Sequence, residues 1–155
     1  MFVLGKVKYS HTNLIATDWK RIAKFYIDVF GCVPVGPIRK LSGENLKNAT
    51  GVDEPEIEGV HLQLPGYEKG GPTLEVFQYR NIRNERRRFA NSRGFTHIAF
   101  EVSDLEEVCA NVIRNGGWML GELARQPIEG VGVCTFVYVR DPDRNIIEIQ
   151  GWEVA

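Results

Sequence analysis

Polar and apolar residues alternate along the stretch GFTHIAFEVSD, residues 94–104. Such alternation predicts a β-strand with one buried face and one face that carries polar groups. The two faces consist of Thr96, Ile98, Phe100 and Val102, and of His97, Ala99 and Glu101. The second face is unusual, because it combines an imidazole and a carboxylate on a strand whose other neighbours are apolar.

A similar arrangement occurs earlier in the chain. Residues 11–32 and 97–118 both begin with a strand histidine, followed seven residues later by an aspartate (Asp18, Asp104) and then by an amphipathic helix that ends near glycine. Each aspartate is predicted to cap its helix by accepting a hydrogen bond from a first-turn N–H group. The apolar helix faces are predicted to be Ile22, Phe25, Tyr26 and Val29 in the first helix, and Leu105, Val108, Val112 and Ile113 in the second.

Three extended segments follow each helix, separated by turns rich in glycine and proline. They are residues 33–41, 58–65 and 72–80 in the first half, and 118–126, 131–141 and 145–152 in the second. Residues 42–56 are predicted to be an excursion with one helical turn. The pattern is βαβββ repeated after about 86 residues, which indicates an internal duplication and an α+β fold. We therefore expect one domain, residues 1–155, made of modules 7–80 and 94–152 joined by a linker, 81–93.

The duplication pairs His11 with His97 and Glu75 with Glu148. Either histidine or either glutamate alone would be an ordinary strand residue. A carboxylate in a stretch that favours burial, however, needs a proton, a partner or a cation. Imidazole nitrogens with carboxylate oxygens suit zinc, nickel, cobalt, manganese or ferrous iron, whereas calcium prefers more oxygen ligands. The four residues together predict a site for one divalent metal ion.

Composition excludes several other classes of protein. Hydrophobic residues make up 43% and charged residues 25% of the chain, and the net charge is −1. This balance does not favour binding to nucleic acid or to a membrane surface. No stretch is long and apolar enough for a membrane span or a signal peptide, and Cys32, Cys109 and Cys134 form no CxxC pair. We therefore expect a cytoplasmic protein, with Cys109 and Cys134 as core thiols.

His11, Glu75, the strand GFTHIAFEV and the turn and strand DPDRNIIEI resemble the vicinal oxygen chelate superfamily. This superfamily includes glyoxalase I, methylmalonyl-CoA epimerase, bleomycin- and fosfomycin-resistance proteins and extradiol dioxygenases, and the resemblance extends from about residue 7 to 152. It implies two βαβββ modules that form an open mixed-sheet barrel around one divalent metal (Zn, Ni, Co, Mn or Fe). Carried over by position, the metal ligands are His11, Glu75, His97 and Glu148.

The resemblance also implies a reaction. A small-molecule substrate with two adjacent oxygens would chelate the metal, which polarises a carbonyl and stabilises the enediolate left when a neighbouring proton departs. Glu75 or Glu148 would act as the catalytic base. The sequence thus predicts a glyoxalase-like lyase or isomerase. Two positions depart from the bacterial glyoxalase I pattern: Ile15 replaces an arginine that helps to hold glutathione, and Tyr79 replaces an asparagine. These departures count against glutathione as the substrate.

Three alternatives share the fold. A methylmalonyl-CoA-epimerase-like isomerase fits the order of the strands, although that family usually has glutamine at the position of Glu75. A ferrous extradiol dioxygenase would use His11, His97 and Glu148 as a facial triad. A non-catalytic protein that binds a drug or antibiotic is a third alternative, but such binders typically lack the ligand set.

Several further expectations concern the surroundings of this site. His61 either lines the site as an acid or base or is simply exposed, and the arginine-rich run from Arg80 to Arg88 is interpreted as a solvated linker. The turn Asp141–Asp143 is predicted to be structural and to aim Glu148. A homodimer is expected, because modules of this kind leave sheet edges that association can cover.

Overall fold

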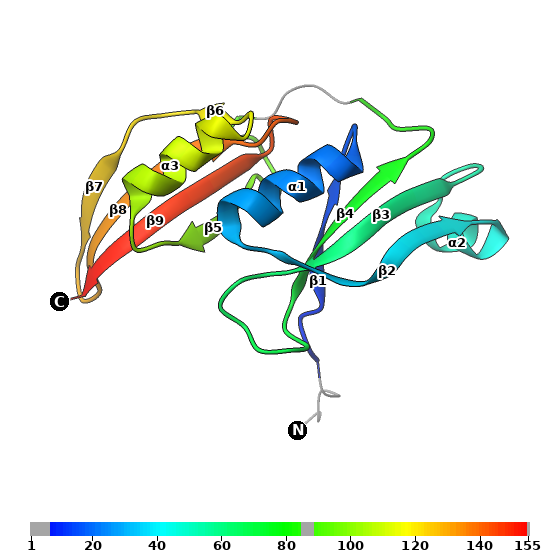
Figure 1. Cartoon of the computed structure of the whole chain (residues 1–155), viewed down its shortest axis with the longest axis horizontal. Coiled ribbons are helices and arrows are strands. Elements are labelled where there is room, and N and C mark those ends of the chain that lie inside the picture. Colours follow the sequence, from blue (N-terminus) through cyan, green and yellow to red (C-terminus); the bar gives the residue numbers. More distant parts are fainter. Residues whose placement is uncertain (1–6, 85–88, 155) are drawn as a thin grey trace. The chain divides into compact units, whose positions relative to one another are not determined.

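The computed structural model describes residues 7–84 and 89–154, which form three helices and nine strands (Figure 1). The strands make two mixed sheets, and neither sheet closes on itself. The α+β class and the two-sheet architecture predicted from the sequence are confirmed. No helix among the described residues is long and apolar enough to cross a bilayer.

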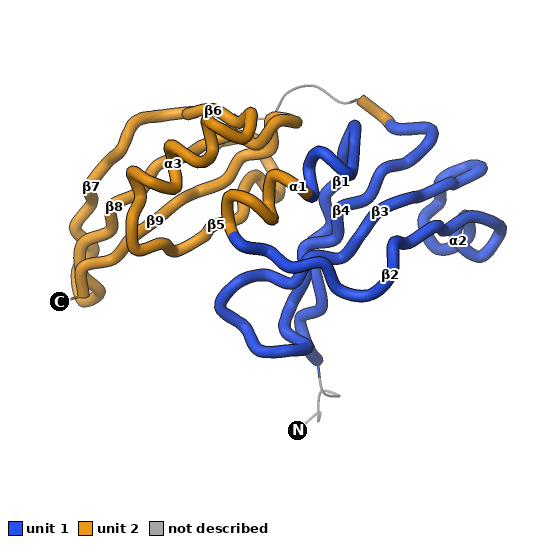
Figure 2. Tube along the Cα trace, viewed as in Figure 1, with its two compact units in different colours: residues 1–23, 31–82 blue, residues 24–30, 83–155 orange. Residues whose placement is uncertain are grey.

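The chain divides into two compact units, shown in different colours in Figure 2. Unit 1 comprises residues 1–23 and 31–82, and unit 2 comprises residues 24–30 and 83–155. The boundary passes through helix α1 (Trp19–Phe30), so the second part of this helix belongs to unit 2 although the first βαβββ pattern in the sequence includes it. In unit 2 the ring of Phe30 stacks on Phe100 with centroids 4.0 Å apart.

Unit 1 contains a four-stranded sheet in the order β1-β4-β3-β2. Strands β1 and β4 are parallel, and the other two pairs are antiparallel. A short helix, α2 (Glu44–Thr50), lies in the excursion after β2, where the sequence predicted about one helical turn. The strands are β1 (His11–Ile15), β2 (Val33–Ser42), β3 (Glu56–Gln63) and β4 (Thr73–Tyr79).

Unit 2 repeats this arrangement in a five-stranded sheet, with the order β5-β9-β8-β6 and with β7 also paired to β8. Helix α3 (Leu105–Arg114) connects β5 to β6. The strands are β5 (His97–Glu101), β6 (Trp118–Met119), β7 (Ala124–Ile128), β8 (Gly132–Arg140) and β9 (Ile146–Val154).

The single strand predicted over 118–126 is wrong, because β6 and β7 are separate. Met119 pairs with Val139, and Ala124 pairs with Phe136. The chain therefore advances five residues from Met119 to Ala124 while the partner strand β8 advances only three. The N–H groups of Leu120 and Gly121 both donate to the carbonyl oxygen of Tyr138. The extra residues therefore bulge out of the ladder and interrupt the strand.

Both predicted helix caps are confirmed. Oδ1 of Asp18 accepts hydrogen bonds from the N–H groups of Lys20 (3.1 Å) and Arg21 (3.2 Å) at the start of α1. The side chain of Asp104 accepts from the N–H of Glu107 (3.0 Å) at the start of α3. These bonds satisfy donors that have no partner within a helix, and so they fix where each helix begins.

The predicted core face is confirmed for α1 but only partly for α3. Ile22, Phe25, Tyr26 and Val29 are all buried. In α3, Ile113 is 57% exposed, and the buried residues are Cys109 and Val112. Because eight residues advance a helix about 80° beyond two full turns, Ile113 lies past the edge of the stripe that begins at Leu105. Its assignment to the core was therefore wrong.

The three cysteines are free and buried, which confirms the core role predicted for Cys109 and Cys134. Burial raises the pKa of Cys32 to about 12. Burial also raises the pKa of Cys109 and of Cys134. Because the thiolate is the reactive form, we regard all three as packing residues.

The turn between β8 and β9 is held by a fully buried carboxylate. Oδ1 of Asp141 accepts from the N–H groups of Asp143 and Asn145, both at 2.9 Å, and Oδ2 accepts from the Asn145 amide (2.7 Å) and the Tyr26 hydroxyl (2.9 Å). Burial raises the pKa of Asp141, and these four donors offset part of that rise. The hydroxyl comes from the part of α1 that belongs to unit 2, so Asp141 fixes the turn and anchors that helical segment to it.

Glycine is required at position 117, just before β6. A Cβ there would lie 2.4 Å from the carbonyl oxygen of Arg140 and 2.8 Å from Cγ1 of Val112. Because backbone cannot yield as a flexible side chain can, we expect Gly117→Ala to lower the free energy of unfolding by about 2–3 kcal/mol. Gly121→Ala is the matched control, since nothing lies within 4 Å of its Cβ position, and we expect a change below about 0.5 kcal/mol. Urea unfolding of both variants checks this, and equal midpoints would contradict it.

Candidate metal centre

Three side chains with metal-binding atoms gather on one face of the sheet in unit 1. They come from three adjacent strands: His11 from β1, Glu75 from β4 and His61 from β3. Each offers one donor atom, and these atoms all lie within 4.8 Å of one another. The strand alternation explains the grouping, because β4 directs Leu74 and Val76 into the core and leaves Glu75 on the opposite face.

Glu75 is the centre of this group, and its carboxylate is held from both sides. Oε1 accepts a hydrogen bond from the Asn13 amide at 2.7 Å, and Oε2 lies 2.9 Å from Nε2 of His61 and 3.7 Å from Nε2 of His11. The Glu75 side chain is only 13% exposed. Polar partners on both oxygens fix the orientation of the carboxylate.

His61 lies between Glu75 and a hydroxyl group. Its Nδ1 is 3.0 Å from Oγ1 of Thr73, and its Nε2 faces Glu75. Burial lowers the pKa of His61, and Arg39 and His11 lower it further, whereas Glu75 raises it. A neutral His61 that donates from Nε2 to Glu75 accepts at Nδ1 from the Thr73 hydroxyl.

Unit 2 carries a second histidine–glutamate pair. Nε2 of His97 in β5 lies 3.7 Å from Oε2 of Glu148 in β9, the same distance as between His11 and Glu75. The Gln150 amide approaches the same Glu148 oxygen at a longer 3.4 Å, and the ring of His97 meets that of Tyr138 edge-on, with centroids 5.1 Å apart. Glu148 is thus held less firmly than Glu75.

Strand register shows which residues correspond in the two sheets. Glu75 pairs with Asn13 on one side and His61 on the other, and Glu148 pairs with Ala99 and Tyr138 in the same way. The histidines of the two pairs stand two residues before Asn13 and Ala99, so they correspond as well. The scaffold is repeated, but the groups beside the glutamate differ.

The structure therefore brings the four ligands predicted from the sequence together as two pairs, His11 with Glu75 in unit 1 and His97 with Glu148 in unit 2. It also places Nε2 of His61, whose role the sequence left open between lining the site and exposure, 2.9 Å from Oε2 of Glu75. The signal was present, because alternation along GVHLQL turns His61 away from the core residues Val60 and Leu62. What the sequence lacked was the register that places it opposite Glu75.

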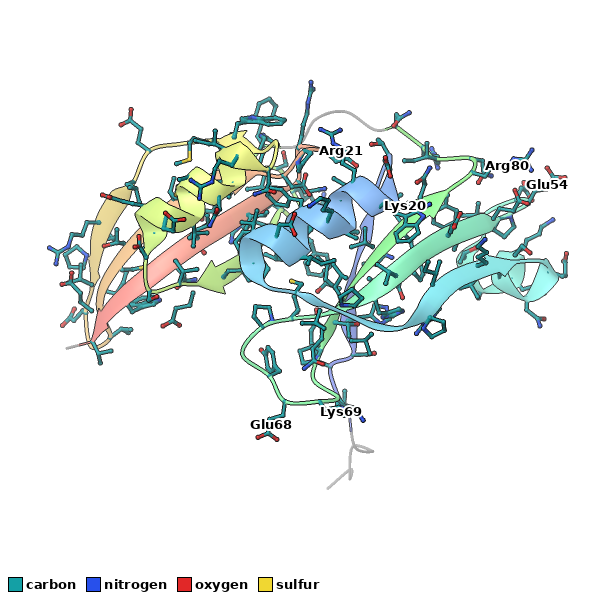
Figure 3. The ribbon with its side chains drawn as sticks, viewed as in Figure 1. Lys20, Arg21, Glu54, Glu68, Lys69 and Arg80 are labelled. Atoms are coloured by element: carbon teal, nitrogen blue, oxygen red, sulfur yellow. The ribbon has the colours of Figure 1, made fainter. Side chains whose placement is uncertain are left out.

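The arginine-rich run is described only in part. Arg86, Arg87 and Arg88 lie outside the described residues. Arg80 follows β4 (Figure 3), where its guanidinium is paired with Glu56 at 2.8 Å. It lines a groove of about 450 Å³ that also contains the ion pair of Lys40 with Glu58. Since each of these cations has an acidic partner, the groove offers no surplus positive charge to an anionic substrate.

The sequence of this chain matches one family model over residues 8–149, that of the Glyoxalase/Bleomycin resistance protein/Dioxygenase superfamily. A comparison with curated proteins finds no match.

Solved structures support the same fold. A glyoxalase family protein from Bacillus cereus is similar with a TM-score of 0.82, 17% identity and 98% of both chains covered. FosX, a fosfomycin resistance protein from Listeria monocytogenes, gives a TM-score of 0.59 and 15% identity over 97% of this chain and 96% of its own. A glyoxalase I mutant from Zea mays gives 0.63 and 21% identity, over 92% of this chain and 44% of its own. At these identities the likeness shows the fold alone.

Proposed function

Because the chain belongs to the Glyoxalase/Bleomycin resistance protein/Dioxygenase superfamily, we propose that it is a divalent-metal-dependent lyase or isomerase of the glyoxalase type. The reaction proposed is proton transfer at a carbon next to a carbonyl group. One observation carries the proposal: each unit presents an imidazole and a carboxylate from adjacent strands, 3.7 Å apart. The repetition of this pair in equivalent register is difficult to explain by packing alone.

We propose His11, Glu75, His97 and Glu148 as ligands of one divalent ion per chain. The donor chemistry fits, since neutral imidazole and carboxylate groups are the ligands preferred by zinc, nickel, cobalt, manganese and ferrous iron. When bound, the ion supplies Lewis acidity that polarises a substrate carbonyl. The two carboxylates balance its charge, and the histidines and glutamates orient the substrate oxygens that approach.

Of the two glutamates, Glu148 is the better candidate for the catalytic base. Glu75 is held by contacts to Asn13 at 2.7 Å and to His61 at 2.9 Å, one on each of its two oxygens, so its carboxylate has little freedom to turn toward a substrate. Glu148 has the longer contact to Gln150 at 3.4 Å. Its carboxylate is therefore freer to turn toward a substrate carbon and to accept its proton, while Glu75 remains a fixed ligand.

The residues near Glu75 favour a substrate other than a glutathione adduct. Ile15 is 38% exposed and lies on the same face of β1 as His11 and Asn13, and Tyr79 follows Glu75 on the same face of β4. This surface is apolar and aromatic at the two positions where an arginine and an asparagine would serve glutathione. We therefore propose a small substrate with two adjacent oxygens and an uncharged or apolar remainder.

The test is proton exchange at the substrate carbon. The protein, loaded in turn with each of the five metals, would be incubated in deuterated water with α-hydroxyketones, methylglyoxal–thiol adducts and acyl thioesters, and deuterium would be measured by mass spectrometry. We expect incorporation with at least one pair of metal and substrate, and its loss in Glu148→Gln. Absence of exchange from every pair, in protein that holds one ion per chain, would refute the proposed reaction.

A second candidate function rests on the composition of the group in unit 1. Two histidines and one carboxylate, here His11, His61 and Glu75, are also the ligand set of ferrous oxygenases. Oxygen uptake by the iron-loaded protein with catechols would support this candidate. It would be rejected if the iron-loaded protein takes up no more oxygen than its His11→Ala variant.

We also propose that the chain acts as a homodimer through the edge of the first sheet. Strand β2 ends the strand order and is exposed along almost its whole length, including Val33, Ile38 and Leu41. An apolar edge of this kind favours association. We expect sedimentation to give a dimer that Ile38→Lys dissociates and that Ile113→Lys, at an equally exposed helical position, leaves intact. A monomeric wild type would contradict this.

A further inference from the structure

The two sheets differ in one respect that the repeat does not explain. Opposite Glu75 stands His61, whereas the equivalent position opposite Glu148 is occupied by Tyr138. His61 carries an imidazole, a common metal ligand, and its Nε2 lies 2.9 Å from Oε2 of Glu75. Unit 1 therefore presents three neighbouring side chains of types that commonly bind metal ions, and unit 2 presents the pair of His97 and Glu148.

We propose that His61 is itself a metal ligand, so that unit 1 binds a divalent ion through His11, His61 and Glu75 even without the pair in unit 2. This inference rests on the proposed function, because it concerns the same ion. It adds a residue to the ligands that the sequence suggested. It also predicts that the two pairs contribute unequally to the affinity.

The distances between donor atoms support this assignment. Two ligands bound to one ion at about 2.1 Å lie about 3.0–3.4 Å apart when they subtend a right angle or a tetrahedral angle. Oε2 of Glu75 is 2.9 Å from Nε2 of His61 and 3.7 Å from Nε2 of His11, which brackets that range. These two distances therefore need only small adjustments, and all three donor atoms already lie within 4.8 Å of one another.

Thr73 supplies the remaining requirement. A ligating histidine commonly donates its other ring N–H to a neighbouring acceptor, which fixes the tautomer and the orientation of the ring. The Thr73 hydroxyl lies 3.0 Å from Nδ1 of His61, and a hydroxyl can accept as well as donate. When Nε2 binds the ion, Nδ1 carries the proton and donates to Oγ1 of Thr73. In the metal-free arrangement, in which His61 donates to Glu75, the same contact runs in the opposite direction and the Thr73 hydroxyl donates to Nδ1.

The experiment measures Co²⁺ binding to the full chain by calorimetry and by visible absorption. The starting protein is the double variant His97→Ala/Glu148→Gln, which lacks the donors of unit 2. We expect it to retain one Co²⁺ per chain. Adding His61→Ala should weaken binding about 100-fold or more, and adding Thr73→Val should weaken it about 10-fold, whereas Thr73→Ser should restore it. Tyr138→Phe is the matched control in unit 2 and should change the affinity less than about threefold.

The results separate this inference from the proposed function. The inference fails if wild-type protein binds one Co²⁺ and the double variant binds none. It also fails if the Co²⁺ affinity of the double variant does not change when His61→Ala is added. In both cases the proposed function stands. If wild-type protein binds no Co²⁺, both fail. Thr73→Val keeps the test valid should His61→Ala not fold, because valine has nearly the same shape as threonine. Equal affinity in Thr73→Val and Thr73→Ser would also contradict the inference.

Discussion

Asp141→Ala is expected to lower the free energy of unfolding by about 4 kcal/mol. The substitution removes the acceptor of four hydrogen bonds at a position with no solvent exposure. The Tyr26 hydroxyl and the Asn145 amide lose this partner, and a buried polar group without a partner costs about 1–3 kcal/mol. Urea unfolding followed by circular dichroism measures the loss.

Two companion variants test the cause. Tyr26→Phe removes only one of the four donors, so we expect a loss of about 1 kcal/mol. Glu129→Ala changes an exposed carboxylate and should have an effect below about 0.5 kcal/mol. The role assigned to Asp141 is wrong if Asp141→Ala destabilises the protein no more than Tyr26→Phe does.

Glu148→Gln is expected to weaken metal binding about 100-fold and to abolish proton exchange at the substrate carbon, a loss of about 10²–10⁴-fold in rate. The amide has the same shape as the carboxylate but carries no charge to offer the ion and cannot act as the base. The fold should be unaffected, because Glu148 takes no part in the core. Metal titration and the deuterium assay measure the two effects separately.

Glu101→Gln is the matched control, because Glu101 is an exposed strand glutamate on the same face of β5 as His97. Its metal affinity and exchange rate should equal those of the wild type. A Glu148→Gln protein with full metal content and full turnover would refute both roles proposed for this residue.

Features that depend on neighbouring residues were predicted well from the sequence. The helix caps at Asp18 and Asp104 need only an aspartate followed by a helical turn, and both form. Strand alternation correctly put Phe100 in the core and His97 on the other face. Such local preferences act over a few residues, and a single sequence contains them in full.

Features that depend on pairing between strands were not predictable in the same way. The break between β6 and β7 arises because the N–H groups of Leu120 and Gly121 donate to the same carbonyl oxygen of β8. The residues near Leu120 do not indicate how this segment pairs with β8, so the break could not be predicted from them. His61 was left undecided for the same reason, since its importance comes from lying opposite Glu75. Ile113 shows a further limit, because a small angular error moves a residue from the edge of an apolar stripe to the surface.

The most direct test of the account is the number of divalent ions per chain, measured by plasma mass spectrometry after reconstitution with nickel, zinc, cobalt, manganese and ferrous iron in turn. We expect one ion per wild-type chain with at least one of these metals, and a much weaker affinity in Glu148→Gln. Two ions per chain would show that the two histidine–glutamate pairs act independently. No ion with any of the five metals would contradict the proposed metal chemistry altogether.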